Sequence, residues 1–157
     1  MQDIPQIILA AILVDTITVA ILYTLNKGGY AVKQWYKEFR TGAACMDVFS
    51  IIIATGAANA LGTTLAQKIF YLLLIQIVHD LVVGWLVKSV HSKSTLLNMW
   101  KRYADEIGFT IIIVDAIMLL STLFLVQYMK KFNFSDSTLI YASILVFYIL
   151  LMFVYSF

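Results

Sequence analysis

Five ionisable side chains stand inside long apolar segments of this sequence. Asp15 lies in the first such segment, Asp47 in the second, His79 and Asp80 in the third, and Asp115 in the fourth. A charged group is costly in hydrocarbon, so these side chains are expected to turn toward other helices or toward water. Such a set could form a proton or cation path, hold a metal ion through His79 and carboxylates, or act as an acid–base pair on a lipid.

The same side chains could instead hold helices together. Acids within a membrane accept hydrogen bonds from polar groups of adjacent helices, and Asn59 and Gln76 are amides in the same apolar segments. A metal site is the weakest interpretation, because only one histidine lies in an apolar segment and carboxylates would have to supply the other ligands. We therefore expect neither a metal nor another cofactor. We expect the polar cluster mainly to fix helix packing, and its members are Asp15, Asp47, Asn59, Gln76, His79, Asp80 and Asp115.

The sequence lacks the common catalytic and phosphate-binding motifs. It has no nucleophile motif, no phosphate-binding glycine loop and no His-x-x-x-His pair, so we expect the protein not to be an enzyme. The single Cys45 excludes an intramolecular disulfide and a Cys-x-x-Cys redox pair. A net charge of +2, scattered over several loops, does not favour nucleic-acid binding.

The composition is that of an integral membrane protein. Hydrophobic residues make up 62% of the chain and charged residues 13%, and the mean hydropathy is +0.90. The 157 residues have room for about five membrane-spanning helices with short connections. We predict one all-α helix bundle over residues 1–157, with spans at about 4–25, 43–65, 69–87, 107–129 and 138–157. The first five residues carry no lysine or arginine, so the first span is expected to be retained and not to be a cleaved signal.

Two polar connections have the pattern of short amphipathic helices in the membrane interface. Residues 31–40 place aromatic and basic side chains on opposite faces, and residues 88–106 contain a comparable mixture. We expect both to bind membrane lipids through interfacial anchors, namely Trp35, Tyr36, Arg40, Trp100, Lys101 and Arg102. Because each segment precedes a span that contains an acid, Asp47 in one case and Asp115 in the other, a parallel internal repeat is an open alternative.

The basic residues predict an orientation. Eight lie in the first and third connections (Lys27, Lys33, Lys37, Arg40, Lys88, Lys93, Lys101 and Arg102), against Lys68, Lys130 and Lys131 on the other side. The positive-inside rule then favours an outside or lumenal amino terminus and a cytoplasmic carboxyl terminus. Four spans in place of five would move the carboxyl terminus to the opposite side.

Four short motifs resemble a family of multi-span membrane proteins of nucleocytoplasmic large DNA viruses. They are WYKEF at Trp35–Phe39, ACMDVFSI at Ala44–Ile51, QIVHD at Gln76–Asp80, and YADEIG at Tyr103–Gly108 followed by Asp115. The resemblance covers roughly residues 35–123. It implies a viral origin and a place in a virion internal membrane or a virus-modified host membrane, and it implies no particular activity.

We therefore expect a structural protein of a viral membrane that contacts the capsid layer through its short connections. Its expected partners are lipids, capsid proteins and other copies of itself. One alternative is a small ion channel or proton-coupled transporter that uses the intramembrane carboxylates. Another is a lipid-modifying enzyme with His79 and Asp80 as its acid–base pair.

Overall fold

The computed structural model describes residues 3–25, 29–90, 94–108 and 110–157. Within these residues the chain forms seven α-helices and one short 3₁₀ helix, and no strand, so the predicted all-α helix bundle is confirmed. Five helices are long and apolar enough to cross a membrane: α1 (Ile4–Thr24), α3 (Thr41–Leu61), α4 (Leu65–Ser89), α6 (Thr110–Met129), which continues into η1 (Lys130–Phe132), and α7 (Asp136–Val154). The other two, α2 (Gly29–Phe39) and α5 (Thr95–Ile107), are short and amphipathic.

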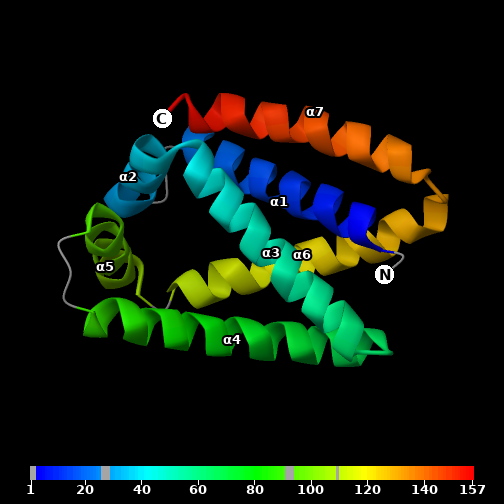
Figure 1. Cartoon of the computed structure of the whole chain (residues 1–157), viewed down its shortest axis with the longest axis horizontal. Coiled ribbons are helices and arrows are strands. Elements are labelled where there is room, and N and C mark those ends of the chain that lie inside the picture. The colour runs from blue at the N-terminus through cyan, green and yellow to red at the C-terminus, as the bar shows by residue number, and fades with distance from the viewer. Residues whose placement is uncertain (1–2, 26–28, 91–93, 109) are drawn as a thin grey trace.

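The spans pack around α1, which is the most buried of the five. It contacts α3, α6 and α7, whereas α4 packs on α3 and α6 and has the largest share of its surface outside the bundle. Figure 1 shows α7 running beside α1, and α2 and α5 gathered at one end of the molecule. The span rich in small residues, α3, contacts five other helices (α1, α2, α4, α6 and α7) but is less enclosed than α1.

The turn between α3 and α4 lies earlier in the chain than predicted. The Thr64 side chain accepts a hydrogen bond from the Gln67 backbone N–H, and the Gln67 side chain accepts one from the Thr64 N–H, which is a capping box. This cap starts α4 at Leu65, before the predicted start at residue 69. A Cβ atom at Gly62 would lie 2.7 Å from the Lys68 backbone nitrogen, so the turn needs glycine.

Helices α2 and α5 form a joined layer at one end of the bundle, which we call the platform. The Glu106 carboxylate in the last turn of α5 accepts hydrogen bonds from the backbone N–H groups of Tyr30 (2.6 Å) and Ala31 (2.8 Å), at the start of α2. An anion there satisfies amides that a helix leaves unpaired and complements the helix dipole. Gly29 has φ +72°, and a Cβ atom on it would collide with this carboxylate.

A polar contact ties three elements at the opposite end. Asp3 Oδ2 accepts hydrogen bonds from Lys130 Nζ and Asn59 Nδ2, each at 2.6 Å. Burial alone would raise the pKa of Asp3, but the hydrogen bonds from Lys130 and Asn59 outweigh it and the pKa lies below its ordinary value. The start of α1, the last turns of α3 and the end of α6 are thereby held together.

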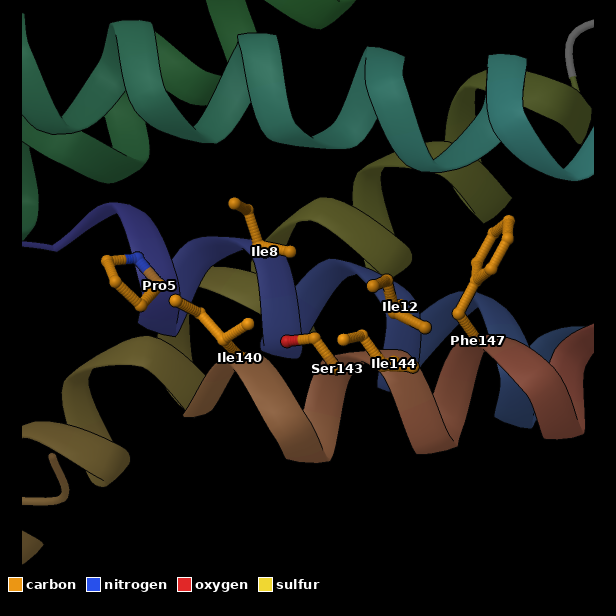
Figure 2. Close-up of a pocket in the computed structure, with 7 residues that line it drawn as sticks. All are labelled: Pro5, Ile8, Ile12, Ile140, Ser143, Ile144 and Phe147. Carbon is orange, nitrogen blue, oxygen red and sulfur yellow. The ribbon is translucent and has the colours of Figure 1, made fainter. Parts of the chain in front are cut away.

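An apolar groove of about 320 Å³ runs between α1 and α7 (Figure 2). Its lining residues are Pro5, Ile8, Ile12, Ile140, Ser143, Ile144 and Phe147. The one hydroxyl among them, that of Ser143, donates a hydrogen bond of 2.8 Å to the Leu139 carbonyl oxygen. The groove therefore offers an apolar surface, as expected for helices that face lipid.

Candidate functional site

The first part of the acidic cluster lies where α2 meets α3. Asp47, in the second turn of α3, accepts on one oxygen, Oδ2, a hydrogen bond of 2.8 Å from the Tyr36 hydroxyl and one of 3.3 Å from the Trp35 indole N–H. Both donors belong to α2 and are almost fully buried, with 5% of Tyr36 and 6% of Trp35 exposed. Asp47 therefore joins the platform to a membrane span.

Asp15 lies in the middle of α1, deep in the bundle. Its side chain is 0% exposed, and neither carboxylate oxygen has a hydrogen-bond partner among the described residues. It interacts electrostatically with Asp47 of α3 and with Tyr36 of α2. A buried acid without a partner is rare in proteins, because an unpaired charge in a medium of low dielectric constant is strongly unfavourable.

The second part of the cluster lies between α4 and α6. The Gln76 side-chain amide donates hydrogen bonds to Asp80 Oδ2 (2.6 Å) and to Asp115 Oδ2 (3.2 Å), so one amide joins the two acids and the two helices. His79 Nδ1 lies 3.1 Å from Asp80 Oδ1, and the side chain of Asp80 is 9% exposed. The His79 side chain is 54% exposed and projects from the least buried span.

Tyr103 of α5 connects the two parts. It interacts electrostatically with Asp115 and Asp80 on one side and with Asp47 on the other. Burial, followed by these three carboxylates, raises the pKa of Tyr103 above its ordinary range. Burial, with Asp47 and Asp15 nearby, likewise raises the pKa of Tyr36. Both phenols therefore keep their protons at neutral pH, and that of Tyr36 serves as a hydrogen-bond donor.

Most of the predicted cluster is thus brought together, but Asn59 is not part of it. Asn59 and Asp47 are twelve residues apart on α3, which places them about 18 Å apart along the helix axis. Asn59 instead donates to Asp3 at the opposite end of the bundle. Including Asn59 in the cluster was therefore wrong, since its partner lies in the first residues of the chain.

Two of the predicted interfacial anchors also need correction. Trp35 and Tyr36 turn inward onto Asp47 and are not at the surface, because the apolar face of α2 packs on the bundle. Trp100 is partly buried and packs on Trp35, with ring centroids 6.2 Å apart.

The basic anchors lie nearer to the surface. Arg40 is exposed, and its guanidinium lies over the Tyr155 ring at 5.2 Å. The Lys101 ammonium group donates a hydrogen bond of 2.9 Å to the Val90 carbonyl oxygen at the end of α4. Arg102 is exposed and lines a shallow pocket between α2 and α5 with Gln34 and Glu38.

No protein-family model, no curated protein and no solved structure matches this chain.

The helix arrangement has an internal correspondence. α1, α2 and α3 correspond in order to α4, α5 and α6. If each helix is replaced by its counterpart, the contact of α1 with α6 becomes the contact of α4 with α3, and both contacts are present. Each unit carries an acid in its first span, a tyrosine in its amphipathic helix and an acid in its second span: Asp15, Tyr36 and Asp47 in one, Asp80, Tyr103 and Asp115 in the other. Each repeating unit therefore starts with a membrane span, whereas the repeat considered from the sequence started with the amphipathic segment.

Sequence reasoning did not single out Tyr103 and Glu106 as functional residues. Tyr103 could have been found from spacing, because it precedes Asp115 by twelve residues as Tyr36 precedes Asp47 by eleven. Glu106 had no such signal, since its partners are backbone amides more than seventy residues away.

The cluster offers carboxylates, phenols, one amide and one imidazole. Among the residues that the structure describes, no group of three or more His, Cys, Asp or Glu side chains could hold a metal ion. His79 and Asp80 have the contact of an acid–base pair, but the two cavities described above are lined by other residues. The chemistry that these groups have in common is to hold and pass protons and to form hydrogen bonds between helices.

Proposed function

We propose that the protein is a structural component of a membrane, in which five spans anchor a rigid basic platform at the membrane surface. Following the resemblance to proteins of large DNA viruses, the proposed location is a virion internal membrane, with the platform in contact with the capsid layer. By loop charge the platform would lie on the cytoplasmic side, with the amino terminus outside or lumenal.

The observation that carries this proposal is the clamp between the amphipathic helices. Glu106 binds the first amides of α2, and Trp35 packs on Trp100, so two elements far apart in sequence are held as one surface. A helix that only floats in the interface needs no such cap. A preorganised surface loses less entropy when it binds a partner.

The charge at the platform end supports the same interpretation. Lys37, Arg40 and Arg102 are exposed there, and the Lys88 side chain is 62% exposed. Two further basic residues of the predicted set, Lys27 and Lys93, lie outside the described residues. Exposed cations suit either anionic lipid headgroups or an acidic protein surface.

The acids support a packing role in part. Asp47 accepts from α2, and Asp115 accepts from α4, so each holds two elements in register. These are the contacts expected of a scaffold whose function is to keep one shape.

The test uses purified virus particles that carry the full-length protein with a photo-reactive residue at position 37 or 102. A third position, Tyr141 on α7, is the control because it is 74% exposed and lies on a lipid-facing span. We expect adducts with a capsid protein from positions 37 and 102, and adducts with lipid from position 141. Absence of the protein from purified particles, or lipid adducts at all three positions, would contradict the proposal.

A second candidate function is proton-coupled transport. It is favoured by the electrostatic continuity from Asp15 through Asp47, Tyr103 and Asp115 to Asp80, which involves four spans. Proton flux into liposomes would distinguish the two functions. D80N and D115N should abolish flux without loss of folding if the protein is a transporter, whereas D105N, at a position whose side chain is 72% exposed, should leave flux unchanged.

A further inference from the structure

Asp15 presents two free carboxylate oxygens inside a packed bundle. The side chain is 0% exposed, and no described residue donates a hydrogen bond to Oδ1 or Oδ2. A carboxylate in this position must be neutralised. The free-energy cost of burying an isolated charge in a medium of low dielectric constant is much larger than the free energy gained from one hydrogen bond. Something that carries positive charge must bind there.

Among the described residues, the groups that interact with Asp15 add negative charge and no positive charge. α3 contributes Asp47, and α2 contributes the Tyr36 hydroxyl, which is engaged with Asp47. Tyr103 of α5 and Asp115 of α6 interact with Asp47. Within the described part of the chain, α7 and α4 contribute no ionisable group that interacts with Asp15. The described residues therefore do not supply the neutralising species.

The number of free oxygen atoms limits what that species can be. Asp47 Oδ2 already accepts two hydrogen bonds, and the two oxygens of Asp15 have no hydrogen-bond partner in the described structure. Calcium takes six to eight oxygen ligands and magnesium about six. The two carboxylates together have at most four oxygens, which is fewer than either ion takes, whereas a proton needs only one.

We propose that Asp15 is a reversible proton-binding site and that Asp47 is the group through which its proton arrives and leaves. Asp47 is partly exposed at the platform end, whereas Asp15 is sealed by packing. A proton taken up from water by the Asp47 carboxylate passes to the Asp15 carboxylate, so Asp15 becomes the neutral acid and Asp47 returns to its anionic form, held by Tyr36 and Trp35. This inference goes beyond the structural role and does not depend on which membrane holds the protein.

The test is infrared spectroscopy of the purified full-length protein in lipid nanodiscs at neutral pH. We expect a carboxylic-acid carbonyl band that is lost in D15N and unchanged in D105N. D15E, which keeps an acid, should shift the band without removing it, and this variant guards against loss of the band through misfolding. An unchanged band in D15N, or a band lost in D47N but kept in D15N, would overturn the proposal.

Two further measurements test the route and the identity of the ligand. On transfer to heavy water, the Asp15 band should shift by deuteration, and D47N should slow that shift severalfold. Equal exchange rates in the wild type and D47N would remove Asp47 from the route. Replacing sodium by choline should leave the band unchanged; a band that appears only without sodium would show that a metal cation occupies the site and would overturn the proposal.

Discussion

The Glu106 carboxylate of α5 accepts a hydrogen bond of 2.8 Å from the Ala31 backbone N–H of α2, across 75 residues of sequence. This contact determines whether the amphipathic helices act as one platform or as two separate helices. It caps a helix start, it places an anion at the positive end of the helix dipole, and it depends on the absence of a side chain at Gly29.

E106Q should loosen α2. The amide keeps the size of the side chain but lacks the negative charge and offers only one acceptor oxygen, and the loss of such a cap costs about 1 kcal/mol. We expect faster hydrogen exchange in α2, with little change in α1 or α7. D105N is the matched control, because Asp105 is adjacent and makes an exposed contact of 3.7 Å with Lys88.

Y36F should destabilise the whole bundle. It removes the hydroxyl that donates to Asp47 Oδ2, so the carboxylate keeps only the donor from Trp35 on that oxygen. We expect the free energy of unfolding to fall by about 1–3 kcal/mol. Thermal unfolding in detergent measures the loss. Y30F should have no effect, because Tyr30 is 69% exposed and contributes its backbone N–H to the Glu106 contact.

The raised pKa values of two tyrosines predict that the folded protein loses stability at alkaline pH. The pKa values of Tyr36 and Tyr103 are raised in the folded protein by burial and then by nearby carboxylates, so the folded state holds these protons more tightly than the unfolded chain. Their contribution to stability is therefore complete below the unfolded value of about 10 and is lost as the pH rises through the folded values. Unfolding temperatures should fall above that pH, and by less in Y36F. An equal decline in Y36F would contradict the assignment to Tyr36.

The lysine at the opposite end of the bundle should matter more than its neighbour. K130M removes the ammonium group that donates to Asp3, whereas K131M removes one that lies 5.9 Å from the Tyr128 ring centroid. Because the pKa of Asp3 is lowered in the folded state, the stability it contributes is present above the unfolded value of about 4 and is lost as the pH falls through the folded value. K130M should weaken this acid dependence and K131M should not. Identical acid unfolding of the two variants would contradict the proposed Asp3–Lys130 tie.

The spans could be predicted from sequence because lipid leaves the backbone few choices. An apolar segment in hydrocarbon must pair its own amides, so its length and composition are enough to indicate a helix. The amphipathic pattern of residues 31–40 and 88–106 likewise predicted the short helices α2 and α5.

What could not be predicted was which surface each apolar face would meet. The aromatic face of α2 has the same pattern whether it faces lipid or protein, and it was the position of Asp47 that turned Trp35 and Tyr36 inward. Asn59 was misplaced for a similar reason, since its partner Asp3 lies 56 residues away. Contacts of this kind depend on the tertiary arrangement and leave no local signal.

Gln76 and Gln127 provide a matched pair of substitutions. Gln76 Nε2 donates to Asp80 and Asp115, whereas Gln127 Nε2 is buried with no hydrogen-bond partner among the described residues. Q76M removes a shared donor and leaves two carboxylates underpaired, so we expect a loss of about 1–3 kcal/mol. Q127M removes an unsatisfied polar atom and should be neutral or stabilising. Equal unfolding free energies for the two variants would mean that the Gln76 bridge does not hold α4 and α6 together, and the packing role proposed for Asp115 would then have to be abandoned.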